Sequence, residues 1–175
     1  MRRVAGVAVV FLAGLIAVSF AVASANGRWS QHANGSMEVP TRDSQGQGQG
    51  IFKLSDDGSS IDYKLIASNI DNVFMAHIHM AGPGVNGPVV VWLYPGTAVN
   101  VTGPLGAGRT DGVLVEGSFT AANLTGPLAG QPLSALIAAM DSGNTYLNFH
   151  TNDGVAPTNT GPGDFPGGEI RGDIG

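Results

Sequence analysis

The sequence predicts an all-β fold, namely an antiparallel Greek-key β-sandwich of about seven to eight strands with one short helix near residues 133–141. Two features of the composition favour this class. The chain contains 27 Gly and 10 Pro, residues that end regular segments and form turns. Between the turns lie short runs rich in β-branched residues, which are typical of strands. A third observation is that only one segment of the mature chain has apolar residues at helical spacing.

Residues 1–25 have the features of an export signal. Arg2 and Arg3 supply a positive end, residues 4–22 are apolar and uncharged, and Ala23-Ser24-Ala25 has the form accepted by signal peptidase. We expect cleavage after Ala25, which leaves residues 26–175 as a single domain. The alternative is an uncleaved membrane anchor, because the apolar run approaches the roughly 20 residues that span a bilayer.

The charge and cysteine content limit the partners and the location of the mature chain. Without Arg2 and Arg3 the chain keeps 6 basic and 13 acidic residues, a net charge of −7 that argues against binding to nucleic acid or anionic lipid. The chain has no cysteine, so its stability must come from packing rather than from disulfides. We expect a secreted, periplasmic or cell-surface protein whose partner is an unknown extracellular protein or envelope component.

The first half of the mature chain predicts three strands. Residues 29–39 form a first strand that ends before Pro40, because proline cannot donate to a β-ladder. Residues 41–49 are polar and rich in glutamine and glycine, and we expect a flexible connection there. Residues 50–54 and 61–65 form a hairpin around Asp57-Gly58, which supplies the positive φ that a tight turn requires.

The second half predicts the remaining strands and the helix. Strands are expected at residues 73–80, 88–94, 110–119, 146–151 and 169–174. The helix rests on Leu133, Leu136, Ile137 and Met140, whose spacing places them on one helical face, and Gly143 is suited to end it. Residues 152–168 form a long loop, which in a compact domain is usually functional or mobile.

Several separated motifs resemble those of the CHRD domain, which is named from its repeats in chordin, an extracellular antagonist of bone morphogenetic proteins. The resemblance covers about residues 28–174 and implies a secreted or surface-exposed β-sandwich. It does not imply an enzyme, because no general activity is established for the family. The long insert between His150 and Glu169 departs from the family pattern. The motifs are Glu38-Val39-Pro40, Ala76-His77-Ile78-His79, Gly82-Pro83-Gly84-Val85-Asn86-Gly87-Pro88, Asn123-Leu124-Thr125-Gly126-Pro127-Leu128, Asn144-Thr145-Tyr146-Leu147-Asn148-Phe149-His150-Thr151 and Gly167-Gly168-Glu169-Ile170-Arg171-Gly172.

Alternation of side chains along the strands gives each of three strands one apolar and one polar face. His77 and His79 share a face, and His150 lies on the polar face of another strand. In one interpretation these faces are solvated or held by hydrogen bonds, with Glu169 and Arg171 paired with each other or with a histidine. In the other, His77, His79 and His150 bind copper or zinc, and Glu169 is a fourth ligand or supports a histidine ring. His32 is expected to be an incidental surface residue.

Two classes of function remain open, and catalysis is not expected. The His-x-His pattern is similar to copper-zinc superoxide dismutase, but four histidines are too few for its binuclear centre and its disulfide cannot form without cysteine. The chain has no thiol nucleophile and no Gly-x-Ser-x-Gly motif. We therefore expect a non-enzymatic binding or structural module of the cell envelope, and the alternative is a metal-binding protein that uses the three histidines.

Overall fold

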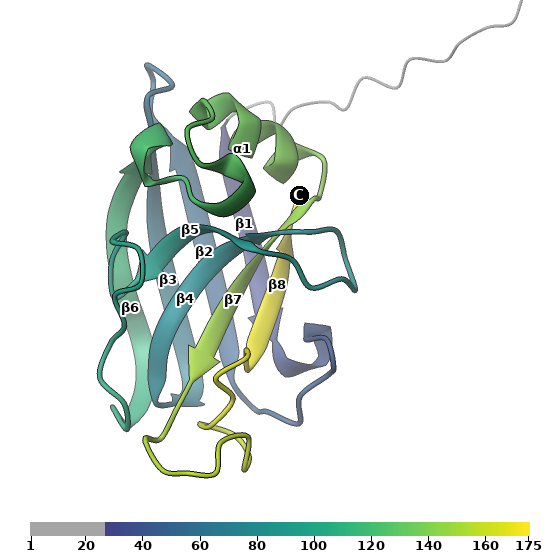
Figure 1. Ribbon diagram of the computed structural model, residues 1–175, viewed down its shortest axis with the longest axis vertical. Coiled ribbons are helices and arrows are strands. Elements are labelled where there is room, and N and C mark those ends of the chain that lie inside the picture. Colours follow the sequence, from purple (N-terminus) through teal and green to yellow (C-terminus); the bar gives the residue numbers. More distant parts are fainter. Residues whose placement is uncertain (1–26) are drawn as a thin grey trace, which may run out of the picture.

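The computed structural model describes residues 27–175, and the predicted export signal lies outside them. These residues form eight strands and one α-helix, together with three short 3-10 helices (Figure 1). The strands are β1 (Arg28–Asn34), β2 (Gln47–Leu54), β3 (Ser60–Asp71), β4 (Val73–Met80), β5 (Val89–Tyr94), β6 (Arg109–Thr120), β7 (Thr145–Thr151) and β8 (Ile170–Ile174). The helices are α1 (Leu133–Asp141), η1 (Gly35–Met37), η2 (Ala121–Asn123) and η3 (Gly126–Leu128).

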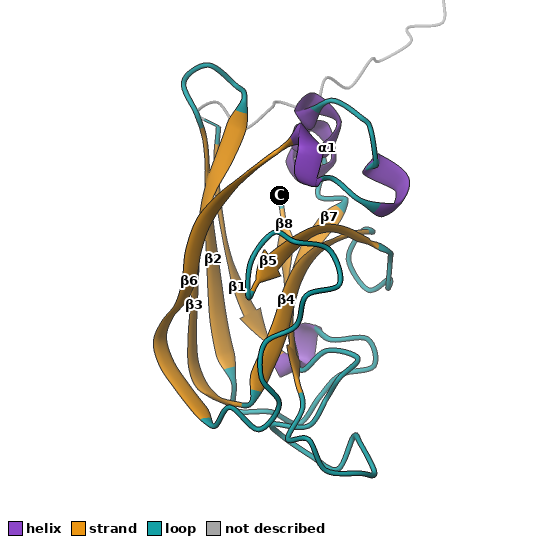
Figure 2. Ribbon diagram, turned by 60° about the vertical axis from the view of Figure 1, so that its left-hand side comes forward, coloured by secondary structure: helices purple, strands orange, loops and turns teal. Residues whose placement is uncertain are grey.

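All eight strands belong to one antiparallel sheet with the order β5-β4-β7-β8-β1-β2-β3-β6. The sheet curves back on itself, so that β1, β2, β3 and β6 form one layer and β4, β5, β7 and β8 form the layer facing it (Figure 2). The predicted all-β antiparallel class, its number of strands and its single helix are confirmed. The two layers are halves of a single, nearly closed sheet, with β5 and β6 as its outer strands.

The core lies between the two layers and is closed at one end by α1 (Figure 2). Ile78 and Phe149 alternate with the histidines along their strands, which assigns them to the apolar faces, and both are 0% exposed, so the assignment of faces is confirmed. In α1, Leu133, Leu136 and Met140 are buried as the helical spacing predicted. Gly143 follows the helix with a φ of +68°, the left-handed conformation that ends many helices.

The first strand is shorter than predicted. It ends at Asn34 rather than at residue 39, because the Asn34 side chain accepts a hydrogen bond from the backbone N–H of Ser36 at 3.0 Å and starts η1. Arg42 then donates its backbone N–H to the Gly35 carbonyl at 2.8 Å. Residues 35–42 therefore form a closed loop after β1, and Glu38 lies within this loop.

The second strand begins inside the segment predicted to be a flexible connection. β2 starts at Gln47, and its two inward glycines lie directly below core side chains. A Cβ on Gly48 would lie 2.7 Å from Phe149 Cε2, and one on Gly50 would lie 2.7 Å from Leu147 Cδ2. The glycines therefore make room for the opposite layer, which a Gln/Gly pattern does not reveal in the sequence.

Three loops cover the outer face of the β4–β7–β8 layer. They are residues 35–46, 81–88 and 152–169, and they contact one another: Asn86 Nδ2 donates to the Val39 carbonyl at 2.7 Å, and Arg42 Nε donates to the Gly168 carbonyl at 3.2 Å. The polar face that alternation predicted is consequently buried. Within residues 27–175, no helix is both long and apolar enough to cross a membrane.

Candidate metal centre

Three histidine side chains meet on this covered face. His77 and His79 extend from β4, and His150 extends from the neighbouring strand β7. One nitrogen of each ring lies within 4.8 Å of the others, and His77 Nδ1 is 3.1 Å from His150 Nε2. The three residues are only 2%, 9% and 6% exposed, respectively. Nitrogens that bind one ion at about 2 Å are separated by at most about 4 Å, so small ring movements bring all three to a shared ion.

Backbone carbonyls fix which nitrogens of two rings carry hydrogen. His79 Nδ1 lies 2.9 Å from the Gly87 carbonyl, and His150 Nδ1 lies 2.9 Å from the Pro166 carbonyl. A carbonyl only accepts, so each Nδ1 donates and each Nε2 keeps its lone pair. Hydrogen bonds of this kind commonly orient histidines that bind metals. Neither His77 Nε2 nor His79 Nε2 has a hydrogen-bond partner within residues 27–175.

The surroundings keep all three imidazoles neutral. Burial is the largest cause for each ring: it lowers the pKa of His77 to about 2, with further lowering from His150 and His79. The pKa of His150 falls to about 4 through burial and through His79, against an opposing effect of the Pro166 carbonyl. Burial also lowers the pKa of His79. At neutral pH each ring therefore keeps one unprotonated nitrogen, which metal binding requires.

Aromatic and cationic side chains hold the histidine rings from the sides. Trp92 of β5 meets His77 edge-on, with ring centroids 4.2 Å apart. Tyr146 of β7 stacks on His79 at 4.8 Å with an interplanar angle of 10°. The Arg171 guanidinium lies 3.6 Å from the centre of the Tyr146 ring, a cation–π contact that extends the stack. These contacts restrict the rotation of two of the three rings.

Arg171, a candidate from the sequence, anchors the loop that supports the histidines. Its side chain is fully buried and pairs with Asp173 at 2.8 Å. It also donates to the carbonyls of Gly82 and Val85 at 3.0 and 2.9 Å. This loop supplies the carbonyl that orients His79. Arg171 therefore positions the cluster indirectly, through the loop and through Tyr146.

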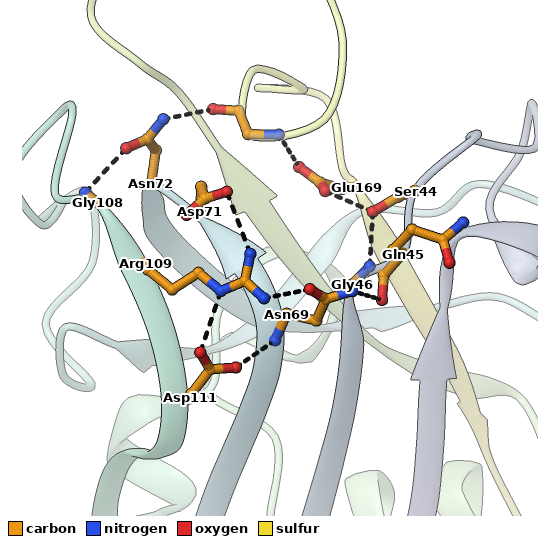
Figure 3. A network of polar contacts seen from close by, with 11 residues as sticks. Ser44, Gln45, Gly46, Asn69, Asp71, Asn72, Gly108, Arg109, Asp111 and Glu169 are labelled. Carbon is orange, nitrogen blue, oxygen red and sulfur yellow. Dashed lines mark hydrogen bonds and ion pairs between the residues drawn. The ribbon is translucent and has the colours of Figure 1, made fainter.

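Glu169, the other charged candidate, lies in a different network. Its carboxylate accepts hydrogen bonds from Ser44 Oγ and Thr151 Oγ1, each at 2.5 Å, and from the backbone N–H of Gly163 at 2.7 Å. Gly163 in turn accepts from Asn72 Nδ2 at 3.1 Å. Figure 3 shows Glu169 joined to this network, which ties the loops at one end of the sheet together. Its contacts go to these loops and to Thr151 at the end of β7, and the residues grouped with the three histidines include no acidic side chain within 27–175.

A buried carboxyl group that the sequence did not single out lies under the same loops. Glu38 is 5% exposed, and burial raises its pKa to about 7. The backbone N–H of Val39, the Asn148 side chain, Arg171 and Arg42 each lower this pKa, in that order. Asn148 alternates with the core residues Leu147 and Phe149 along β7, which places it on the polar face, but nothing in the Glu-Val-Pro motif indicates that Glu38 is covered. His32, by contrast, is exposed on β1, away from the cluster.

The chemistry of the site follows from its donors. Three neutral imidazoles suit copper or zinc, whereas magnesium, calcium and manganese prefer carboxylate and carbonyl oxygens. The structure brings together His77, His79 and His150, and it separates Glu169 from them. Trp92 and Tyr146 complete the surroundings of the site, and neither was proposed as a site residue from the sequence.

Comparison with known proteins places the chain in one family. The CHRD domain model matches residues 29–174, almost all of the part that the structure describes. No curated protein and no solved structure matches the chain significantly. The match spans the strands that carry the three histidines as well as the loops that cover them. The resemblance seen in the motifs is confirmed, and the chain belongs to the CHRD domain family.

Proposed function

We propose that this chain is an exported, non-enzymatic metal-binding module of the CHRD family, in which His77, His79 and His150 hold one copper or zinc ion. One observation carries the proposal. Two buried histidines, His79 and His150, donate their Nδ1 hydrogens to backbone carbonyls and so keep their Nε2 lone pairs, and His150 Nε2 lies 3.1 Å from His77 Nδ1. A buried lone pair without a donor is costly, and an ion bound between the rings would satisfy it.

A hydrogen-bonded cluster without metal is the competing explanation for the same geometry. His77 Nδ1 would then donate to His150 Nε2 across the 3.1 Å separation. This arrangement leaves the Nε2 atoms of His77 and His79 without partners among residues 27–175. Because unsatisfied buried groups reduce stability by about 1–3 kcal/mol each, the metal-bound form accounts better for the site.

The test compares metal-induced stabilisation in the wild type and in matched variants. The mature chain, freed of metal, is melted with and without Zn(II) or copper. At a free-ion concentration 100 times Kd, binding adds about 2.7 kcal/mol, roughly a 5–10 °C rise in Tm for a domain of this size. His79→Ala and His150→Ala should each abolish the rise. His32→Ala, on the exposed face of β1, should retain it.

Metal content provides an independent measurement. The purified wild type, loaded and then desalted, should retain close to one equivalent of metal by elemental analysis, and the His150→Ala variant should retain none. Equal thermal shifts in the wild type and in His79→Ala would contradict the proposal. In that case the cluster stabilises the sheet through hydrogen bonds alone.

Family membership also supports a second candidate function, the binding of an extracellular protein or envelope component by the domain surface. CHRD is a family of non-catalytic domains, and the mature charge of −7 disfavours nucleic acid and anionic lipid. Affinity capture with the mature chain, with and without metal, would test whether a partner binds and whether the ion is needed. A partner that binds the His79→Ala variant equally well would separate the two functions.

Export is part of the proposal and rests on the sequence of residues 1–25. The mature N-terminus should be Asn26, because the Ala-x-Ala site follows the apolar run. Mass spectrometry of the protein recovered from the medium, the periplasm and the membrane fraction would locate it. Recovery of chains beginning at Met1 in membranes would instead support the uncleaved anchor.

A further inference from the structure

The charge around the histidine cluster distinguishes between the possible ions. The cluster contributes three neutral rings, and no acidic residue belongs to it within residues 27–175. The one charge that contributes to the lowered pKa of His79 is the cation of Arg171, and no carboxylate offsets it there. The cost of burying an ion rises with the square of its charge, and only opposite charges offset that cost. A monovalent ion is therefore favoured over a divalent one.

Met75 offers a thioether donor on the strand that carries His77 and His79. It precedes His77 by two residues on β4, and the strand register places it directly opposite His150. Ala76 and Ile78, the alternate residues of β4, are both 0% exposed in the core, so Met75 lies on the histidine side of the strand. Facing residues of an antiparallel pair have Cβ atoms about 5 Å apart, and methionine has three rotatable bonds with which to reach inward.

The accessibility of Met75 differs from that of the histidines. Its side chain is partly exposed, whereas the three histidines are buried. Met75 is thus a partly exposed residue on the histidine side of β4, opposite His150. A thioether is a soft, neutral donor that favours Cu(I) and has little affinity for Zn(II).

We propose that Met75 supplies the fourth ligand of this site and that the ion it selects is Cu(I). The inference rests on the proposed metal-binding function and specifies the ion. It combines two independent features, the absence of a carboxylate among the grouped ligands and the position of a thioether opposite His150. Each feature favours a soft monovalent cation over Zn(II).

Competition against chromophoric chelators tests the preference. The mature wild type competes for Cu(I) with bathocuproine disulfonate under anaerobic, reducing conditions, and for Zn(II) with a chromophoric zinc chelator. Met75→Leu should weaken Cu(I) binding by at least about tenfold, the low end for lost support to a metal site, and leave Zn(II) binding within about threefold. Met80→Leu is the control, because Met80 lies on the opposite face of β4 and packs against the core.

X-ray absorption on the Cu(I)-loaded wild type provides a readout that does not depend on a variant folding. A sulfur neighbour at copper should be present in the wild type and in Met80→Leu, and absent in Met75→Leu. If the wild type binds neither metal, the proposed function itself fails. If it binds metal but shows no copper–sulfur contribution, equal Cu(I) affinity in Met75→Leu, or a preference for Zn(II), only the present inference is overturned.

Discussion

Replacing Glu38 by glutamine should stabilise the protein above neutral pH. The carboxyl group is 5% exposed, and its pKa is raised from 4.5 to about 7, mainly by burial. Because the folded-state pKa lies above the unfolded value, folding takes up a proton between these two pH values. Glu38 therefore carries no penalty below about pH 4.5 and its full penalty above about pH 7.

The size of the effect follows from this difference in pKa. One pKa unit corresponds to about 1.4 kcal/mol, so the ionised Glu38 costs about 3 kcal/mol of stability at pH 8. Attraction to Arg171 and Arg42 is already included in the raised value. Glutamine keeps the shape of the side chain without ionising. The Glu38→Gln variant should thus exceed the wild type by up to about 3 kcal/mol at pH 8 and match it near pH 4.

Chemical denaturation at several pH values between 4 and 9 measures this difference. Other titrating groups contribute equally to both proteins, so the gap between the two curves reports on Glu38 alone. Glu116→Gln is the control, because Glu116 is exposed and paired with Lys64, and its removal should change stability by less than about 1 kcal/mol. The argument from burial would be refuted if the difference in unfolding free energy between Glu38→Gln and the wild type were the same at pH 4 and pH 8, or if the variant were less stable at pH 8.

Three further predictions concern the core, the contact between layers and the histidines. Ile78→Ala and Phe149→Ala should each cost about 2–5 kcal/mol by urea denaturation, because both side chains are fully buried, and a loss below about 1 kcal/mol in both would contradict the core assignment. Tyr63→Phe should cost about 1–3 kcal/mol in the same assay, because the hydroxyl donates to a buried carbonyl of β5 at 2.7 Å. In the metal-free Glu38→Gln background, the free energy of unfolding should fall as the pH drops from 6.5 to 4, because the pKa of His150 is about 4 in the folded chain and imidazole ordinarily titrates near 6.5. His150 alone accounts for about 3 kcal/mol of this loss, and His77 and His79, whose pKa values are also lowered, add to it; a flat profile would show that burial does not lower these pKa values.

The lowered pKa values also change the expected pH range of metal binding. From the ordinary imidazole pKa, the sequence predicts that affinity falls below about pH 6.5. In the folded chain His77 and His150 remain neutral to about pH 2 and about pH 4. Protons therefore begin to compete for the folded site at lower pH than the sequence alone suggests. The ordinary value applies to an exposed ring and contains no information on burial.

Local patterns in the sequence were sufficient for the strands and their faces. Side chains alternate along a strand whatever its neighbours, so Ile78 and Phe149 could be assigned to the core, and His77 and His79 to one polar face, without a structure. The α1 prediction succeeded for the same reason, because a helical period is also local. Predictions of strand ends were weaker. Gln47 extends β2 into a segment that looks like a linker, and its inward glycines are explained only by the opposite layer.

The sequence by itself determined that this is a cysteine-free, all-β chain of the CHRD pattern, with a His-x-His strand and a third histidine on another polar face. These are matters of composition and short-range periodicity. Tertiary structure alone decided that β4 and β7 are neighbours, which brings His150 to 3.1 Å from His77. It also decided that loops cover the polar face and bury Glu38. The physical reason is that strand pairing and loop packing join residues far apart in the chain, which no local pattern contains. Burial in turn determines whether the Glu38 carboxyl group and the histidine rings are charged, because it shifts their pKa values.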